Sequence, residues 1–423
     1  MGATRSVFVS FVASLWLLVA CGGPVGPEAG ALLWTLQFGT GEADVGSAVA
    51  VADDGRIAVA GTTQGPLGGA LEGGWDAFVR LLDADRAVAW THQVGTADDD
   101  RATGVAFHPD GGLVVAGSTS GNLFGPNEGG LDGFVRRVDD HGATLWTHQF
   151  GSAQNDVIEA VAVAADGRVV AAGTTRGALE GASAGLGDAF VRVVDADGVE
   201  VWTRQFGSIG EEFALGVATG PGGRIAVVGG TNGDLANPTA AARAENDAFV
   251  RVVDADGDIV WTHQFGTAVD DHLNRVAIAG DGTVIVFGVT DGALAATNAG
   301  ARDVFARAYG TAGQVLWTRQ FGSEGSDYST GVAVAGVHHV FVAGSTTGTL
   351  AGEAAGGVDA FVARLGPAGA ITWLRQFGTE ADDRARHVAI GPEGQAVVVG
   401  TTGGDLGGPS SGGDDVFLRA YGP

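Results

Sequence analysis

Seven acidic residues recur at one position of a repeated segment and are the first candidates for chemistry. Each lies five residues after the glycine of a Trp-Thr-x-Gln-Phe-Gly segment: Asp44, Asp100, Asp156, Glu212, Asp271, Asp327 and Asp383. Carboxylates gathered in a ring are ligands that Ca²⁺ prefers, and they would also capture a cationic ligand. These positions make calcium the one candidate cofactor.

An architectural role for the same seven residues competes with the metal site. An Asp at such a position caps the turn before it by accepting backbone N–H groups. It can also meet an arginine that recurs once per unit, with Ala363 as the exception: Arg80, Arg136, Arg192, Arg251, Arg307 and Arg419. Six matched arginines favour the architectural interpretation.

A second invariant pair of polar residues belongs to the same architecture. An Asp opens the third expected strand of each unit: Asp76, Asp132, Asp188, Asp247, Asp303, Asp359 and Asp415. A Gln follows in each repeated segment: Gln37, Gln93, Gln149, Gln205, Gln264, Gln320 and Gln376. We expect these pairs to satisfy backbone groups between sheets, since buried polar groups are almost always hydrogen-bonded.

Ligand recognition is better sought where the repeat loses its symmetry. One position of the first expected strand holds Gly or Ala in five units, but Arg275 and His387 in the other two. Two such side chains in a ring of small residues predict a site for an anionic ligand near the central channel. The alternative, which the sequence favours, is that Arg275 and His387 only pair with the neighbouring acids Asp271 and Asp383.

No catalytic motif stands out from the repeats. The chain shows no nucleophile-base pairing, phosphate-binding loop or Cys/His metal spacing. The leading hypothesis is therefore a non-enzymatic binding or scaffold module for a protein or glycan partner. An enzyme acting on a polyanionic sugar at the channel mouth and a calcium-stabilised adhesin are the alternatives.

The elements that must position these residues follow from the period of the repeat. The tryptophans lie 56, 56, 56, 59, 56 and 56 residues apart, and Val94 and Leu374 are the two departures from the repeated segment. In the third unit we expect strands over 158–164, 168–175, 188–195 and 200–206, joined by Asp-Gly turns. Four strands per unit predict an all-β, seven-bladed propeller.

The ends of the chain predict how the ring closes. The mature protein would begin with a lone outer strand over 31–39 and end with a lone third strand over 415–421. Pairing these two strands completes a seventh blade and leaves no unpaired edge. The propeller is thus expected over 31–423.

The repeated unit resembles the SBBP family of bacterial β-propeller repeats. The resemblance rests on Asp-Ala-Phe-Val at 188–191 and 247–250, on Trp261, and on Gly-Thr-Ala-Val-Asp-Asp at 266–271, with equivalents in every unit. It covers the chain from about residue 31 onward. It implies a propeller and no particular reaction, since the family has none in common.

The N-terminus carries an expected export and anchoring signal. Residues 1–20 hold Arg5 and then an apolar stretch over 7–19, which is typical of a secretory signal and too short for a stable membrane span. Leu-Val-Ala-Cys at 18–21 resembles the lipobox of bacterial lipoproteins, which implies a diacylated Cys21; a plain signal peptide beside an odd cysteine is the alternative. Residues 21–30 would form a lipidated Gly/Pro tether reaching about 30 Å.

Charge and localisation complete the expectations. The formal net charge is −26, and all 23 basic residues are arginine, so we expect no nucleic-acid partner. Membrane contact is expected only through the lipid anchor. Gly22 follows the cysteine where enterobacterial lipoproteins carry an inner-membrane retention Asp, so the expected location is the bacterial cell envelope, at the outer membrane. We expect a monomer.

Overall fold

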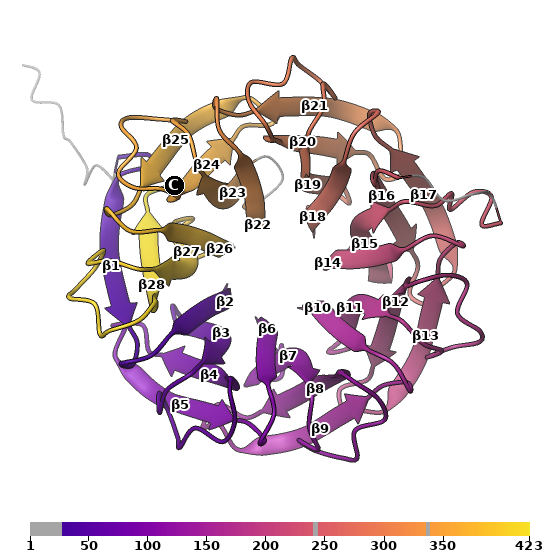
Figure 1. Cartoon of the computed structure of the whole chain (residues 1–423), viewed down its shortest axis with the longest axis horizontal. Coiled ribbons are helices and arrows are strands. Elements are labelled where there is room, and N and C mark those ends of the chain that lie inside the picture. The colour runs from indigo at the N-terminus through magenta and orange to yellow at the C-terminus, as the bar shows by residue number, and fades with distance from the viewer. Residues whose placement is uncertain (1–27, 240–243, 336–338) are drawn as a thin grey trace, which may run out of the picture.

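The chain folds into a ring of seven four-stranded antiparallel sheets around a central channel (Figure 1). The computed structural model describes residues 28–239, 244–335 and 339–423. The expected signal peptide and Cys21 lie outside these residues. Within the described ranges the one helical element is the three-residue turn η1 (Pro221–Gly223), and no helix is suited to cross a membrane. The predicted seven-bladed propeller is confirmed.

Each blade runs from an inner strand beside the channel to an outer strand on the rim. The inner strands are β2 (Asp44–Val51), β6 (Asp100–Phe107), β10 (Asp156–Val163), β14 (Glu212–Gly220), β18 (Asp271–Ile278), β22 (Asp327–Ala335) and β26 (Asp383–Ile390). The second strands are β3 (Ile57–Thr63), β7 (Leu113–Thr119), β11 (Val169–Thr175), β15 (Arg224–Thr231), β19 (Val284–Thr290), β23 (His339–Thr346) and β27 (Ala396–Thr402).

The outer half of each blade completes the sheet. The third strands are β4 (Asp76–Leu82), β8 (Asp132–Val138), β12 (Asp188–Val194), β16 (Asp247–Val253), β20 (Asp303–Tyr309), β24 (Asp359–Leu365) and β28 (Asp415–Tyr421). The outer strands are β5 (Val88–Val94), β9 (Thr144–Phe150), β13 (Glu200–Phe206), β17 (Ile259–Phe265), β21 (Val315–Phe321), β25 (Ile371–Phe377) and β1 (Leu32–Phe38). Blades are numbered from the one that contains β2.

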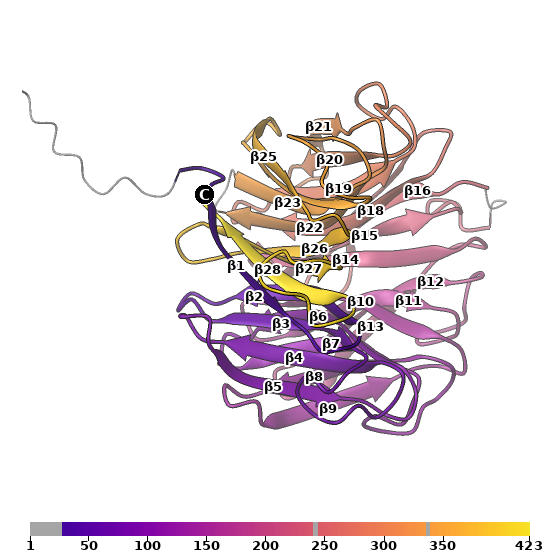
Figure 2. The same cartoon turned by 60° about the vertical axis from the view of Figure 1, so that its left-hand side comes forward.

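The ring closes between the two ends of the chain, as predicted. In blade 7 the order is β26, β27, β28, β1, and β1 pairs antiparallel with β28 through six residue pairs, from Leu32–Tyr421 to Phe38–Val416. Figure 2 shows β1 lying along β28 on the outside of the ring, next to the C-terminus. The N-terminal strand therefore supplies the edge that the last blade lacks.

Two faces of the ring follow from this strand order. The hairpins that join inner to second strands and third to outer strands lie on one side, here called the hairpin face. The longer loops and the connections from each outer strand to the next inner strand lie on the other side, the loop face. β1 starts on the hairpin face and ends on the loop face.

Arginines of the third strands join adjacent blades. Each of the six recurrent arginines donates from Nε to a threonine hydroxyl on the neighbouring outer strand, at 2.8 to 3.1 Å. Five of them also lie over a phenylalanine of the preceding blade; Arg80, for example, is 4.1 Å from the ring centre of Phe38. In blade 2, where Val94 replaces that phenylalanine, Arg136 instead lies over Phe124 at 3.8 Å. The first five are cation–π contacts between blades, whereas the contact of Arg136 with Phe124 lies within blade 2.

The invariant Asp and Gln pairs act within blades, which corrects the expected position between sheets. In every blade the Gln amide donates to the Asp that opens the third strand, at 2.7 to 3.0 Å. In blade 1 the same Gln93 amide also donates to the carbonyl of Gly65, and its oxygen accepts from the amides of Gly68 and Gly69. The pair therefore fastens the loop between second and third strands onto its own blade.

Candidate functional site

A β-bulge interrupts every inner strand at the same place. The pairing of each inner strand with its neighbour skips one residue, for example between Ile158 and Ala160 of β10. A bulge turns its extra side chain away from the sheet and is a common device beside binding sites. The seven bulge residues are Ser47, Thr103, Glu159, Leu215, Asn274, Thr330 and Arg386.

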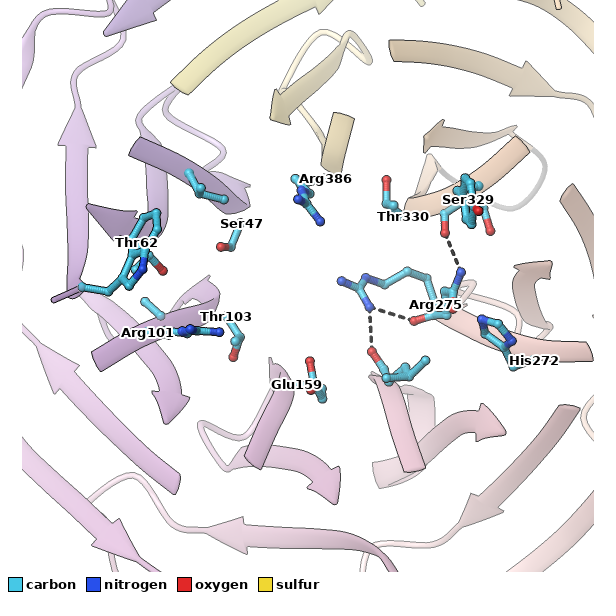
Figure 3. Close-up of a pocket in the computed structure, with 16 residues that line it drawn as sticks. Ser47, Thr62, Arg101, Thr103, Glu159, His272, Arg275, Ser329, Thr330 and Arg386 are labelled. Carbon is cyan, nitrogen blue, oxygen red and sulfur yellow. Dashed lines mark hydrogen bonds between the residues drawn. The ribbon is translucent and has the colours of Figure 1, made fainter. Parts of the chain in front are cut away.

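The bulge residues surround a cavity at the channel mouth on the loop face. All seven line this cavity of about 540 Å³, together with nine further residues that include Arg101, His272 and Arg275. Figure 3 shows the side chains of Arg275, Arg386 and Glu159 directed into the opening. A cavity of this size suits a small ligand or one unit of a polymer.

Arg275 extends from β18 across the channel. Its Nη1 donates to the carbonyl of Leu215 at 2.7 Å and to that of Asn274 at 2.8 Å (Figure 3). Burial within the ring lowers the pKa of Arg275, Glu159 opposes this change, and the nearby charge of Arg386 adds to it. The side chain is surrounded by protein yet borders the open cavity, so it is half-buried. The guanidinium groups of Arg275 and Arg386 therefore face the same cavity.

Arg386 and Glu159 are the charged members of the bulge ring. Neither side chain makes a hydrogen bond or ion pair within the part of the chain that the structure describes, whereas Thr103, Asn274 and Thr330 donate to a backbone carbonyl of the next blade at 2.7 Å. Burial lowers the pKa of Arg386 and raises that of Glu159. The two charges are available to a ligand.

His387 lies deeper in the channel than Arg386. It lines a narrower cavity of about 70 Å³ together with Glu159 and Arg275, so these two residues border both cavities. Its Nδ1 is 3.2 Å from the carbonyl oxygen of Val49. Burial, followed by the charge of Arg275, lowers its pKa to about 4, so the imidazole is neutral at pH 7.

The alternative that Arg275 and His387 pair with Asp271 and Asp383 is wrong. The carboxylates of Asp271 and Asp383 accept hydrogen bonds from Thr267 and Thr379 instead. Arg275 donates to backbone carbonyls, and His387 lies beside one. Both residues line the channel, where the broken symmetry predicted a ligand site.

The seven recurrent acids occupy separate turns. Each is buried, and each accepts a hydrogen bond from the backbone amide and from the hydroxyl of the Thr or Ser four residues earlier. In the described residues no group of three or more His, Cys, Asp or Glu side chains is placed to hold a metal ion. Turn capping accounts for the position of each acid.

The bulge ring is the part of the site that sequence reasoning missed. The aligned position that singled out Arg275 and His387 lies one residue after the bulge, where most blades carry Gly or Ala. The bulge position itself varies through Ser, Thr, Glu, Leu, Asn, Thr and Arg, and the residue before it varies as well, through Gly, Ala, Ile, Ala, Leu, Ser and Ala. The two charged residues of the bulge series, Glu159 and Arg386, were the available signal.

Comparison with known proteins leaves the family open. No protein-family model matches the chain, so the resemblance to SBBP repeats rests on its motifs. The regulatory protein FlaEY of Caulobacter vibrioides is 31% identical over 153 residues, which cover 32% of this chain and 16% of that protein. The chain thus matches about a sixth of this curated relative's length.

Solved structures are similar at low sequence identity. Drosophila plexin A, in a complex with semaphorin 1b, aligns with a TM-score of 0.51 and 10% identity, over 94% of this chain and 88% of that chain. YCF48 bound to a D1 peptide aligns with a TM-score of 0.47 and 10% identity, over 94% and 98%. Such identities show the fold alone, and a β-propeller suits a binding or scaffold module.

Proposed function

We propose that this protein is a non-enzymatic, lipid-anchored module of the bacterial cell envelope that binds an acidic glycan at the channel mouth on its loop face. The observation that supports the proposal most strongly is the pair Arg275 and Arg386, which face one cavity. An acidic group between them would offset their mutual repulsion and form charge-assisted hydrogen bonds. The site is thus suited to a carboxylate or a sulfate.

Charge at the cavity contrasts with charge on the whole molecule. Three arginines line the opening, Arg101, Arg275 and Arg386, against one carboxylate, Glu159. The chain as a whole carries a formal charge of −26. A positive cavity in a negative protein selects a ligand by local contacts and not by general attraction.

The remaining lining residues favour a sugar over a peptide. Hydroxyl groups of Ser47 and Thr62 border the cavity, and so do the aromatic rings of Trp75 and Tyr328. Aromatic rings pack against apolar sugar faces, and hydroxyls exchange hydrogen bonds with sugar hydroxyls. The partner we propose is a glycan with acidic sugar units.

The position of the N-terminal segment is compatible with an anchored module. Gly30 donates to the carbonyl of Gly422 at 3.0 Å and packs against Trp373, so the chain enters the ring on the hairpin face. The cavity opens on the opposite, loop face. A lipid on Cys21 would hold the hairpin face toward the membrane and present the cavity away from it.

An enzyme acting on the same ligand fits the site less well. Glycoside hydrolysis commonly uses two carboxyl groups that flank the scissile bond. Among the described residues that line the mouth cavity, Glu159 is the one carboxylate. His272 also lines the cavity, but burial lowers its pKa to about 4, which makes it a weak base.

Isothermal titration of the full chain with an oligogalacturonate, its methyl ester and a glutamate peptide of equal charge tests the proposal. We expect the acid to bind and Arg386→Gln to weaken binding by roughly tenfold or more. Arg384→Gln is the matched control, because Arg384 lies on the same strand and donates to Asp382 at 2.7 Å. Equal binding of the ester would refute an anion site, and tighter binding of the peptide would make the partner a protein.

A further inference from the structure

Apolar side chains are exposed along the rim of the hairpin face. Every outer strand starts on this face, and the two residues before its repeated tryptophan are exposed in each blade. In blades 5 to 7 the large apolar residues at these positions form the rim patch: Leu32, Leu33, Val315, Leu316 and Ile371. Contiguous exposed apolar surface commonly marks a site of membrane or protein contact.

The rim patch extends across three neighbouring blades. Figure 1 shows β1, β25 and β21 following one another along the rim. A Cβ on Gly30, directly before β1, would lie 2.8 Å from the indole of Trp373 in blade 6. A Cβ on Gly369, in a hairpin of blade 6, would lie 2.7 Å from the indole of Trp317 in blade 5. The segment that leads into each outer strand therefore packs against the outer strand of the preceding blade.

Charge separates this part of the rim from the rest. At least two aspartates lie in each connection between third and outer strands of blades 1 to 4, at residues 83–87, 139–143, 195–199 and 254–258. The equivalent residues 310–314 and 366–370 of blades 5 and 6 contain no acid. In the hairpins of blades 5 to 7 that the structure describes, the acids are Asp281 and Glu393, both in hairpins nearer the channel, and Glu28 precedes β1. Aspartates resist leaving water and are repelled by an anionic lipid surface, so the rim of blades 5 to 7 is the part suited to lipid.

Two exposed arginines accompany the rim patch. Arg319 and Arg375 occupy the same position of β21 and β25, and their hydrogen bonds within the described residues go to backbone carbonyls. The equivalent Arg204 in blade 3 also pairs with Glu180, at 3.3 Å. Arg319 lies three residues after Leu316, about 10 Å farther along the strand. Guanidinium groups at that height above the apolar residues are suited to lipid phosphates.

The N-terminal segment enters the ring beside the rim patch. The carbonyl of Gly30 accepts from Nε of Arg375 at 3.0 Å, so the chain is fixed against blade 6 directly before β1. Cys21 precedes Gly30 by nine residues, which span at most about 30 Å. A lipid on Cys21 would therefore hold blades 6 and 7 nearer the membrane than blades 2 and 3, which lie across the ring (Figure 1).

We propose that the rim patch inserts into the lipid surface, so that the anchored propeller rests on blades 5 to 7 and blades 1 to 4 are lifted away from the membrane. This orientation rests on the proposed lipid anchor. The outer strands have a free edge whose backbone groups require water, so insertion stops at the boundary between headgroups and acyl chains, about 5–10 Å deep. Arg319 and Arg375 then contact lipid phosphates.

The test attaches an environment-sensitive fluorophore to the full lipidated chain in vesicles of phosphatidylethanolamine and phosphatidylglycerol. The sequence contains one cysteine, so lipid on Cys21 leaves an introduced cysteine as the reactive thiol. Leu316→Cys and Leu145→Cys compare equivalent leucines, 51% and 52% exposed, on opposite sides of the ring (Figure 1). We expect a quencher carried by the lipids to act at least about threefold more strongly on the label at Leu316→Cys. Equal quenching at the two positions would overturn the proposal.

Flotation with the vesicles separates the orientation from the anchor. The wild type should float with the vesicles, and Cys21→Ser should not. A wild type that does not float would refute the anchor, and the orientation with it. A chain that floats without stronger quenching at Leu316→Cys would refute the orientation alone.

Two charge variants test whether the rim patch acts as a unit. With the fluorophore on Ile371→Cys, Leu316→Asp should lower the quenching at least about twofold, because a carboxylate resists insertion. Leu145→Asp is the matched change in blade 2 and should leave the quenching unchanged. Both leucines are exposed, so neither change should disturb folding. Equal effects of the two variants would contradict the proposal. A dimer in detergent that Leu316→Asp abolishes would make the occupant a second copy and refute the membrane contact.

Discussion

Ala363 of β24 and Leu374 of β25 lie opposite one another at the position where the other six blades pair an arginine with a threonine. Both members of the pair are therefore replaced together in blade 6. Ala363 is fully buried, and Leu374 packs beside it where a guanidinium would lie. An apolar pair thus replaces the polar pair in blade 6.

Restoring the polar pair tests this exchange. Ala363→Arg alone should lower the free energy of unfolding by about 1–3 kcal/mol, because a guanidinium is then buried against leucine. Adding Leu374→Thr should recover about 1 kcal/mol or more, since the threonine hydroxyl accepts from Nε and Phe321 offers its ring. Chemical denaturation of the four members of the cycle measures the coupling, and strictly additive effects would contradict it.

The turn of blade 1 contains a strained arginine. Arg86 has a φ of 69°, at the place where the corresponding hairpins carry a glycine such as Gly198 with a φ of 83°. Its guanidinium lies 5.4 Å from the ring centre of Trp34. Arg86→Gly relieves backbone strain of about 1 kcal/mol and loses a cation–π contact of about 0.5 kcal/mol, so we expect a small net gain in stability.

The reverse change provides the comparison for Arg86→Gly. A Cβ on Gly198 would lie 2.7 Å from a ring carbon of Trp146, so Gly198→Ala should destabilise the protein. Thermal melts of both variants measure whether backbone strain at Arg86 or its contact with Trp34 has the larger effect on stability. A loss of stability in Arg86→Gly would show that the contact with Trp34 outweighs the strain.

Acid should destabilise the protein partly through His387. Burial, followed by Arg275, lowers its pKa from 6.5 to about 4, so the unfolded chain takes up the proton first as the pH falls. The stability contributed by the neutral imidazole is complete above pH 6.5 and is lost as the pH falls toward 4. His387→Ala should therefore reduce the fall in melting temperature between pH 6.5 and pH 4 by about half. The other half remains because the pKa of His272 is lowered to a similar value. Parallel curves for variant and wild type would contradict this.

Calcium should leave the melting temperature unchanged. Oδ2 of Asp100 already accepts from the amide of Thr96 at 2.6 Å and from its hydroxyl at 2.9 Å. Asp100→Ala should cost about 1–3 kcal/mol with calcium or with chelator, since two donors of the turn lose their acceptor. Asp98→Ala, an exposed change in the same turn, is the control. A calcium-dependent rise in the wild type that Asp100→Ala removes would establish a metal site.

Cys21 decides whether the protein is anchored. Cys21→Ser removes the sulfur that the expected lipid would modify. We expect metabolic labelling with a fatty-acid analogue to mark the wild type and not the variant, and the variant to appear in the soluble envelope fraction. Labelling of the variant, or an unlabelled wild type, would contradict the anchor.

The architecture was predictable because the same pattern is repeated. The expected bounds of the outer strand of blade 3, residues 200–206, match β13. The inner strand begins at Asp156, two residues before the expected start, because its carboxylate binds Ser152 and fixes the turn directly beside the strand. A side chain that caps a turn across four residues has no signature in the period-2 pattern.

The site was predictable only in part. Arg275 and His387 stood out as charged or titratable residues among glycines and alanines, and both line the channel. Arg386 and Glu159 did not, because strict alternation assigns a strand residue to one face and a bulge breaks that assignment. The position of a bulge depends on the register with the neighbouring strand, which a single sequence does not display.

The pairing of β1 with β28 also sets the order in which the molecule can form. Blades 1 to 6 each draw their four strands from one continuous stretch, so their contacts need only short loops to close. In blade 7 Thr35 contacts Arg419, which is 384 positions away in the sequence. Contacts at such a long sequence separation form slowly, because a large loop must close first. The strand β1, which is synthesised first, therefore stays unpaired until β28 has been synthesised. The ring closes only when both strands are present.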